Sequence, residues 1–263
     1  MGMRYQEYAP QPALSHLVRC YWTVRGRTES QVAHVNRVLP DGCMDVIFDL
    51  ADRAGPQALI IGTMLQARVF EHAGSMDMLG VRFVPGAAPT VLPLTASTLT
   101  DTTLDAAEVW PDVAGLLDRL STGTDLRQRL QELEAHLMRA HKGRERAPCA
   151  VVGMAHIERA RGRLSVERLC RALQVNERTL QRSFAERVGL TPKQAIRVMR
   201  FRHALRVLQQ RNGTLAAVAH ACGYADQAHF TREFRELAAL SPRAYLRERR
   251  IVGFVQDPDA VSD

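Results

Sequence analysis

The pattern of apolar and polar residues changes its period once along the chain. Before residue 112, short runs rich in β-branched and aromatic residues lie at 19–24, 44–50 and 78–84. Turn sequences such as Pro40-Asp41-Gly42 bound these runs, which is typical of antiparallel strands. From Asp112 onward apolar residues recur every three to four positions, which indicates helices. The pattern predicts the α+β class: a β-rich N-terminal domain that ends in helices, followed by an all-α domain.

A polar segment divides the two parts. Residues 143–148 contain Gly and Pro and interrupt the apolar periodicity on both sides. We therefore expect one domain over 1–142, a linker over 143–148 and a second domain over 149–250. The last residues, 251–263, contain three Asp and no basic residue, and we expect a disordered acidic tail there. A length of 263 residues fits two domains.

The predicted helix over 125–141 has a leucine stripe. Its apolar residues are spaced 4-3-4, as in a coiled-coil seam of two heptads: Leu126, Leu130, Leu133 and Leu137. Two heptads are too short to form a stable coiled coil alone. The stripe therefore either packs on its own β domain or pairs with a second copy of the chain, and these leucines are candidates for dimerisation.

Composition narrows the class of protein. Hydrophobic residues make up 46% of the chain, which is typical of a folded protein. We see no apolar run of about 18 residues and no signal peptide, so we expect a cytoplasmic protein that does not bind membranes. The five cysteines are scattered and no zinc spacing occurs. We also find no Walker loop, Rossmann glycine run or Gly-x-Ser-x-Gly elbow, so we expect neither a metal nor a cofactor, and no enzyme.

Basic residues gather in the second half of the chain. Residues 144–250 contain 22 Lys and Arg against 9 Asp and Glu, whereas residues 1–143 contain 13 against 16. Nearly all of the surplus is Arg, whose planar guanidinium suits phosphates and guanine edges. Such a local surplus indicates a polyanion-binding surface. The alternative is a solvated Arg-rich helical surface.

An internal repeat lies in this basic half. When the sequence is shifted by fifty residues, 165–195 aligns with 215–245 without a gap, and Leu180 and Phe184 fall on Phe230 and Phe234. Each copy predicts a short helix, a tight turn and a second helix that follows an N-cap, Asn176 or Asp226. This arrangement is a helix-turn-helix, whose second helix enters the major groove of DNA.

The second helix of each copy has a polar face. In the first copy Leu180, Phe184 and Val188 share the apolar side, and in the second copy Phe230, Phe234 and Ala238 do so. Between the copies, 191–210 predicts one continuous helix about 30 Å long, close to the roughly 34 Å of one turn of B-DNA. Two recognition helices could therefore occupy successive major grooves. The outward side contains Arg178, Gln181, Arg182 and Ala185 in one copy, and Ala228, Thr231, Arg232 and Arg235 in the other.

The C-terminal hundred residues resemble the AraC/XylS family of bacterial transcription regulators. The second unit has the phrases Cys222-Gly223-Tyr224-x-Asp226-Gln227-x-His229-Phe230-x-Arg232 and Ser241-Pro242-x-x-Tyr245, and the first has Gly189-Leu190-Thr191-Pro192. Two positions depart from the family, because Gln174 and Ala239 stand where it usually has Gly. The resemblance implies that a set of side chains faces DNA: Arg178, Gln181, Arg182, Gln227, Thr231 and Arg232, to which the outward position of Arg235 adds a seventh.

These side chains suit different partners on the duplex. Arg178 and Arg182 can form bidentate contacts to guanine or bind phosphate, and the sequence leaves both open. Gln181 suits adenine or phosphate, and Thr231 suits a thymine methyl group or phosphate.

Residues 1–111 resemble, through shorter phrases, the small β-barrel-like (cupin-like) sensory domain of some family members. The shared phrases are Arg37-Val38-Leu39-Pro40-Asp41-Gly42 and Gly80-Val81-Arg82-Phe83. The resemblance implies a pocket for a small-molecule effector of unknown type. Asp45 and Arg82 could line it if their strand faces point inward, or lie on the surface if they point outward. Our effector-binding candidates are Trp22, Arg37, Asp45 and Arg82.

We therefore expect a sequence-specific, DNA-binding transcription regulator that responds to an effector. Its expected partners are double-stranded DNA, RNA polymerase, the effector and a second copy of itself. One alternative is a DNA-associated thiol enzyme or repair protein that uses Cys43. The other is an architectural protein that binds nucleic acid without sequence preference.

Overall fold

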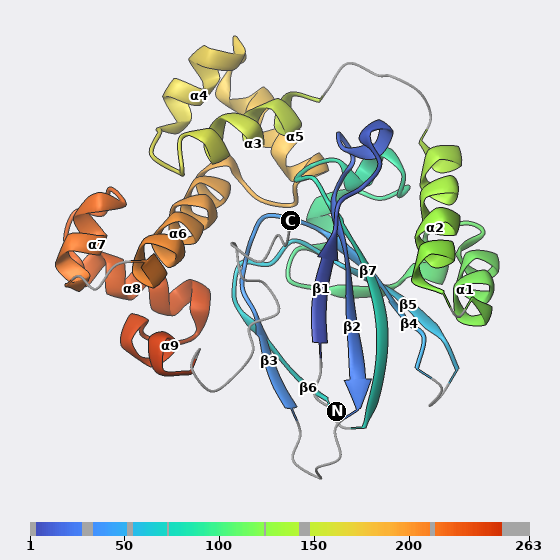
Figure 1. Cartoon of the computed structure of the whole chain (residues 1–263). Coiled ribbons are helices and arrows are strands. Elements are labelled where there is room, and N and C mark those ends of the chain that lie inside the picture. The colour runs from blue at the N-terminus through green and yellow to red at the C-terminus, as the bar shows by residue number, and fades with distance from the viewer. Residues whose placement is uncertain are drawn as a thin grey trace.

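The computed structural model describes residues 4–27, 34–51, 55–72, 74–123, 125–141, 148–210 and 214–248. Antiparallel strands and two helices form the N-terminal part, and the rest is helical (Figure 1). The predicted linker lies outside the described residues except for Pro148, and so does the predicted acidic tail. None of the helices within these ranges is long and apolar enough to cross a membrane.

The described strands form two antiparallel sheets. Six of them pair in the order β1-β2-β7-β4-β5-β8, and β3 pairs with β6 alone. The large sheet is open, because its edge strands do not meet and β8 has only three residues. The N-terminal domain is therefore an open sheet and not the predicted barrel-like fold. The strands are β1 (Arg4–Tyr8), β2 (Val18–Arg27), β3 (His34–Val38), β4 (Asp45–Asp49), β5 (Gln57–Ile61), β6 (Arg68–His72), β7 (Ser75–Phe83) and β8 (Thr103–Asp105).

Two helices cover one face of the large sheet. Alternation along β4 directs Val46 and Phe48 to this face, and both are fully buried. Helices α1 (Val113–Thr122) and α2 (Leu126–Ala140) pack against them. In α2, Leu133 and Leu137 are fully buried in this core, and Leu126 and Leu130 pack partly buried at its edge. The leucine stripe therefore packs on its own β domain, and a second copy of the chain would need another surface.

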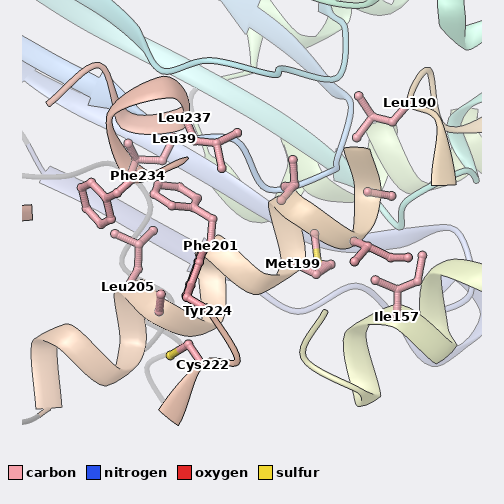
Figure 2. Packing of buried hydrophobic residues seen from close by; sticks show 14 of the residues in the cluster. Leu39, Ile157, Leu190, Met199, Phe201, Leu205, Cys222, Tyr224, Phe234 and Leu237 are labelled. Atoms are coloured by element: carbon pink, nitrogen blue, oxygen red, sulfur yellow. The ribbon is translucent and has the colours of Figure 1, made fainter. Parts of the chain in front are cut away.

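Among the described residues, seven helices form the C-terminal part. The predicted long helix is present as α6 (Pro192–Gln210), and shorter helices lie on either side of it (Figure 1). Phe201, Ala204 and Leu208 bury α6 in the shared core, where Phe234 and Leu237 also pack (Figure 2). The other helices are α3 (Cys149–Arg159), α4 (Val166–Leu173), α5 (Glu177–Arg187), α7 (Leu215–Ala221), α8 (Gln227–Ala238) and α9 (Pro242–Glu248).

The N-terminal part contacts both repeats at equivalent positions. The hydroxyl of Thr63 donates a hydrogen bond of 2.6 Å to the carbonyl of Val188, just after α5. Fifty residues on, at the end of α8, the carbonyl of Ala238 accepts from Arg37 at 3.3 Å. Leu39 packs in the helical core beside Leu237 (Figure 2). The β domain thus holds the same point of each helix-turn-helix unit.

Candidate nucleic-acid interface

Both recognition helices start where the sequence predicts. The side chain of Asn176 accepts a hydrogen bond from the backbone N–H of Thr179 at 2.8 Å and caps α5. The side chain of Asp226 accepts from the backbone N–H of His229 at 2.6 Å and caps α8. Side-chain caps satisfy backbone N–H groups that a helix leaves unpaired at its start. The same device therefore fixes the first turn of each recognition helix.

The two faces of α5 separate as the periodicity predicts. Leu180 and Phe184 are fully buried, whereas Arg178, Gln181 and Arg182 are exposed. Arg182 lies 4.0 Å from Glu186, and its side chain is 73% exposed. An ion pair so open to water contributes little. The guanidinium of Arg182 can therefore change partners for a DNA phosphate or base at small cost.

Helix α8 repeats this division. Phe230, Phe234 and Ala238 are fully buried. Gln227, Arg232 and Arg235 are exposed, and Thr231 is half-buried. All seven predicted DNA-facing side chains thus lie on exposed or half-exposed positions of α5 and α8, and their contact with DNA stays a prediction.

An acidic residue that sequence reasoning missed holds α8 against α6. Glu233 is 5% exposed, and its carboxylate accepts from Arg197 at 3.0 Å and from Arg200 at 2.9 Å. The guanidinium of Arg200 also lies 4.8 Å from the ring centroid of Tyr224, in a cation–π contact. Arg197 pairs with the exposed Glu236 as well. The position of the second recognition helix therefore depends on a buried ion cluster.

The two positions that depart from the family adopt left-handed backbone. Gln174 ends α4 at φ 54°, and Ala239 ends α8 at φ 55°. The residue equivalent to Ala239 in the first unit is Gly189, at φ 81°. A side chain in this region costs about 1–2 kcal/mol that glycine avoids. Both helix ends therefore adopt left-handed backbone although neither residue is glycine.

Three of the four effector candidates meet in one buried group. The indole N–H of Trp22 donates to Asp45 at 2.7 Å, and Arg82 lies 3.3 Å from the same carboxylate. Trp22 packs directly over Gly80, where any Cβ would overlap the indole. The Asp45 face of β4 is thus buried, but its polar atoms are paired with one another. A ligand here would have to displace these pairs. Arg37 lies apart, 3.0 Å from Glu248 of α9.

The buried group continues to the helical part through Asp41. The carboxylate of Asp41 lies 3.4 Å from Arg82 and 3.9 Å from Arg202 of α6. Burial opposes its ionisation, yet these two guanidinium groups hold the pKa of Asp41 below its usual value. Burial raises the pKa of the neighbouring Asp45. Asp41 is therefore the charged partner that joins the β domain to α6.

The candidate thiol nucleophile is inaccessible. Cys43 is 4% exposed. Burial, and then the charge of Asp41, raise the pKa of the Cys43 thiol well above its ordinary value. Reactive cysteines need an accessible thiolate. This environment disfavours the thiol-enzyme alternative.

Comparison with known proteins identifies the helical part. Residues 169–248 match a helix-turn-helix domain family, and residues 6–105 match a domain family of unknown function, DUF6597. The transcriptional activator RhaS of Pectobacterium carotovorum is 36% identical over 67 residues, which cover 26% of this chain and 24% of RhaS. RhaS of Escherichia coli is 33% identical over 79 residues, which cover 30% of this chain and 28% of RhaS. The match thus spans about a quarter of the length of these curated relatives.

Among solved structures, ToxT from Vibrio cholerae is 9% identical, covers 94% of this chain and 97% of ToxT, and has a TM-score of 0.44. The fold and the site define a protein with two helix-turn-helix units joined by a central helix and attached to a β-rich domain. The match gives residues 169–248 a helix-turn-helix domain. The curated relatives that share this part of the chain are transcriptional activators, and the helical part is similar to theirs.

Proposed function

We propose that this protein is a sequence-specific, DNA-binding transcription regulator that places α5 and α8 in successive major grooves. The observation that supports this most directly is the matched pair of capped helices, each with a buried aromatic face and an exposed arginine face. A helix-turn-helix contacts bases through the N-terminal turns of its second helix. Arg178 and Arg182 lie in these turns of α5, and Gln227, Thr231 and Arg232 lie in those of α8.

The separation of the two units fits this mode of binding. Helix α6 has 19 residues, which corresponds to about 28 Å of helix. One turn of B-DNA is about 34 Å. Because Glu233 ties α8 to α6, the spacing between the units does not depend on α6 alone.

The β domain supplies a route for regulation. It bonds to the end of each recognition helix but leaves the polar faces of α5 and α8 exposed. A ligand that binds one arrangement of the β domain better than another would shift the angle between the two units. We expect an effector to act in this way on DNA affinity.

The names of the relatives bear on the direction of regulation. RhaS is named a transcriptional activator, so we expect this protein to bind beside a promoter and contact RNA polymerase there. A homodimer is compatible with this mode, through a surface other than the leucine stripe of α2. We expect the protein in the cytoplasm, with the DNA.

A competition experiment tests the proposed function. The whole chain is titrated, at fixed salt, with a duplex that it has enriched from a random pool, and the complex is competed with random duplex. Arg182→Ala should weaken binding by about 1–3 kcal/mol if this side chain contacts a base. Arg171→Ala is the matched control, because Arg171 is exposed on α4 and lies outside both recognition faces.

The same experiment separates the alternatives. If the protein were architectural, enriched and random competitor duplexes would displace the bound duplex equally well. A thiol enzyme would require Cys43, so Cys43→Ser would abolish its activity but leave a regulator's affinity for DNA unchanged. Equal affinity of the wild type and Arg182→Ala would contradict the assignment of α5.

A further inference from the structure

A hollow in the N-terminal domain involves none of the residues considered so far for an effector. Its volume is about 840 Å³, and it lies between helices α1 and α2 and the turns at 89–93 and 110–112. Sites for small organic ligands usually measure roughly 300–1,000 Å³. The residues of this cavity that matter for its chemistry are Leu92, Trp110, Asp112, Arg119, His136 and Arg139.

The floor of the cavity is apolar and aromatic. Leu92 is 1% exposed, and Trp110 is 3% exposed. The imidazole of His136 meets the indole of Trp110 edge to face, with 5.1 Å between the ring centroids. These side chains are the buried base of the cavity, and its accessible apolar surface comes from Pro89, Pro93 and Pro111.

The rim of the cavity is basic. Arg119 comes from α1 and Arg139 from the last turn of α2, and both are exposed. Arg119 pairs with Glu132 at 3.0 Å, but both side chains are close to half exposed, so this pair exchanges easily for another anion. Asp112 adds one opposing carboxylate to the lining.

The lining contains two guanidinium groups, those of Arg119 and Arg139, and one carboxylate, that of Asp112. The charge on the lining residues therefore favours an anion over a cation. Burial lowers the pKa of His136, and the positive charges of Arg139 and Arg119 lower it further.

We propose that this cavity binds a small organic anion, whose apolar body lies on Pro89, Pro93 and Pro111 and whose carboxylate or phosphate group pairs with Arg119 and Arg139. Arginine suits both anions, because its planar guanidinium can donate two parallel hydrogen bonds. The buried group around Asp45 and Arg82 is different in kind, since its charges already pair with one another.

The position of the cavity suits an effector. Helix α2 forms one wall and ends at Ala140, nine residues before the start of α3 in the helical part. An anion that holds Arg139 against Arg119 would fix the last turn of α2 relative to α1. As an effector site the inference rests on the proposed function, whereas binding of the anion itself does not.

Isothermal titration calorimetry of the whole chain without DNA tests the site. The probes are benzoate, 2-naphthoate and phenyl phosphate, with 2-naphthamide as the neutral match of 2-naphthoate and inorganic phosphate as an anion without an apolar body. We expect 2-naphthoate or phenyl phosphate to bind, and the difference between them identifies carboxylate or phosphate as the preferred group. Both arginine variants, Arg119→Gln and Arg139→Gln, should weaken that binding about tenfold or more.

The matched control is Arg127→Gln, because Arg127 is exposed on the same helix, α2, and does not line the cavity. Its affinity for the probe should equal that of the wild type. Absence of heat with all of the organic anions, equal binding of 2-naphthamide and 2-naphthoate, or equal losses in Arg127→Gln and Arg139→Gln would each overturn the proposal. Inorganic phosphate binding as tightly as phenyl phosphate would also overturn it.

A parallel DNA-binding measurement keeps this inference separate from the proposed function. Probe binding that disappears in Arg139→Gln supports the site even if the chain does not select a DNA sequence. Sequence-specific DNA binding without any probe binding supports the proposed function and overturns the site.

Discussion

Gln174 and Ala239 occupy backbone conformations that glycine adopts more readily. Both have positive φ at the end of a helix, and Gly189 fills the position equivalent to Ala239. In Ala239 the backbone N–H still bonds to the carbonyl of Arg235 at 2.9 Å, so the helix end is formed and only the dihedral angle is unfavourable. Local strain of this kind is relieved by a single substitution.

We predict that Gln174→Gly and Ala239→Gly each stabilise the chain by about 0.5–1 kcal/mol. Glycine removes about 1–2 kcal/mol of left-handed strain. Part of this gain is lost because glycine gives the unfolded chain more conformational freedom. Urea unfolding of the whole chain measures the change. Ala155→Gly, at an exposed position in the interior of α3, is the control and should destabilise by about 1 kcal/mol. A loss of stability in Ala239→Gly would mean that its left-handed backbone is not strained.

Two buried histidines should make stability depend on pH. Burial, followed by neighbouring arginines, lowers the pKa of both His136 and His203. The unfolded chain then binds protons more readily than the folded chain. The contribution of these histidines to the free energy of unfolding is therefore fully present above about pH 6.5 and is lost as the pH falls below it. The loss has an upper limit of about 1.4 kcal/mol per pH unit for each histidine.

Urea unfolding at pH 7.5 and 5.5 measures this effect. The variant with His136→Gln and His203→Gln should lose less stability between the two values than the wild type. His220→Gln is the control, because His220 is exposed on α7. Equal losses in the wild type and the double variant would refute this prediction.

At the scale of elements, periodicity predicts the helices better than it predicts the side-chain contacts between them. The four-residue spacing of Leu180 and Phe184 is sufficient to predict the buried face of α5, and the continuous helix predicted over 191–210 starts within one residue of α6. The Glu233 cluster could not be predicted in this way. It joins Arg197 and Arg200 across 36 and 33 positions of the chain, and no local pattern marks such a pair.

The same limit applies to the sheet. The strands at 44–50 and 78–84 are predicted from their alternation, and Asp45 does share a buried face with Arg82. Whether the sheet closes depends on pairing between its distant edges, which alternation does not encode. The arginine candidate Arg37 shows the difficulty for sites, because its partner Glu248 lies 211 positions away.

The role of Glu233 can be measured against its neighbour in the same helix. We predict that Glu233→Gln destabilises the chain by about 1.5–3 kcal/mol, because it removes charged hydrogen-bond partners from Arg197 and Arg200. Glu236→Gln should cost no more than about 1 kcal/mol, since the side chain of Glu236 is 53% exposed. Urea unfolding distinguishes the two. Equal effects would show that burial of the Glu233 pairs adds nothing.

At the scale of the molecule, the β domain and the helical part form a connected structure. Arg37 and Thr63 bond to the ends of α8 and α5, and Asp41 lies near Arg202 of α6. These contacts hold both units without covering their exposed arginines. This arrangement favours a role of the β domain in fixing the angle between the two helix-turn-helix units, and not in covering their exposed arginines.

We therefore predict that the variant with Arg37→Gln and Thr63→Val binds a duplex with two recognition elements about fivefold more weakly than the wild type. Each lost hydrogen bond is worth about 0.5–1.5 kcal/mol, and the units then lose orientation before binding. Affinity for a duplex with one element should be unchanged. Fluorescence anisotropy at fixed salt measures both. The control combines Arg25→Gln and Thr98→Val, which change the same residue types within the β domain. Tighter binding by the first variant would indicate inhibition by the β domain.

Selection of duplexes from a random pool tests the central claim most directly. The whole chain should enrich a site with two short elements whose centres lie about one helical turn, roughly 10 base pairs, apart. Arg182→Ala should relax the sequence of one element only, and Arg232→Ala that of the other. A pool that stays random, or two substitutions that relax the same element, would contradict the placement of α5 and α8 in successive major grooves.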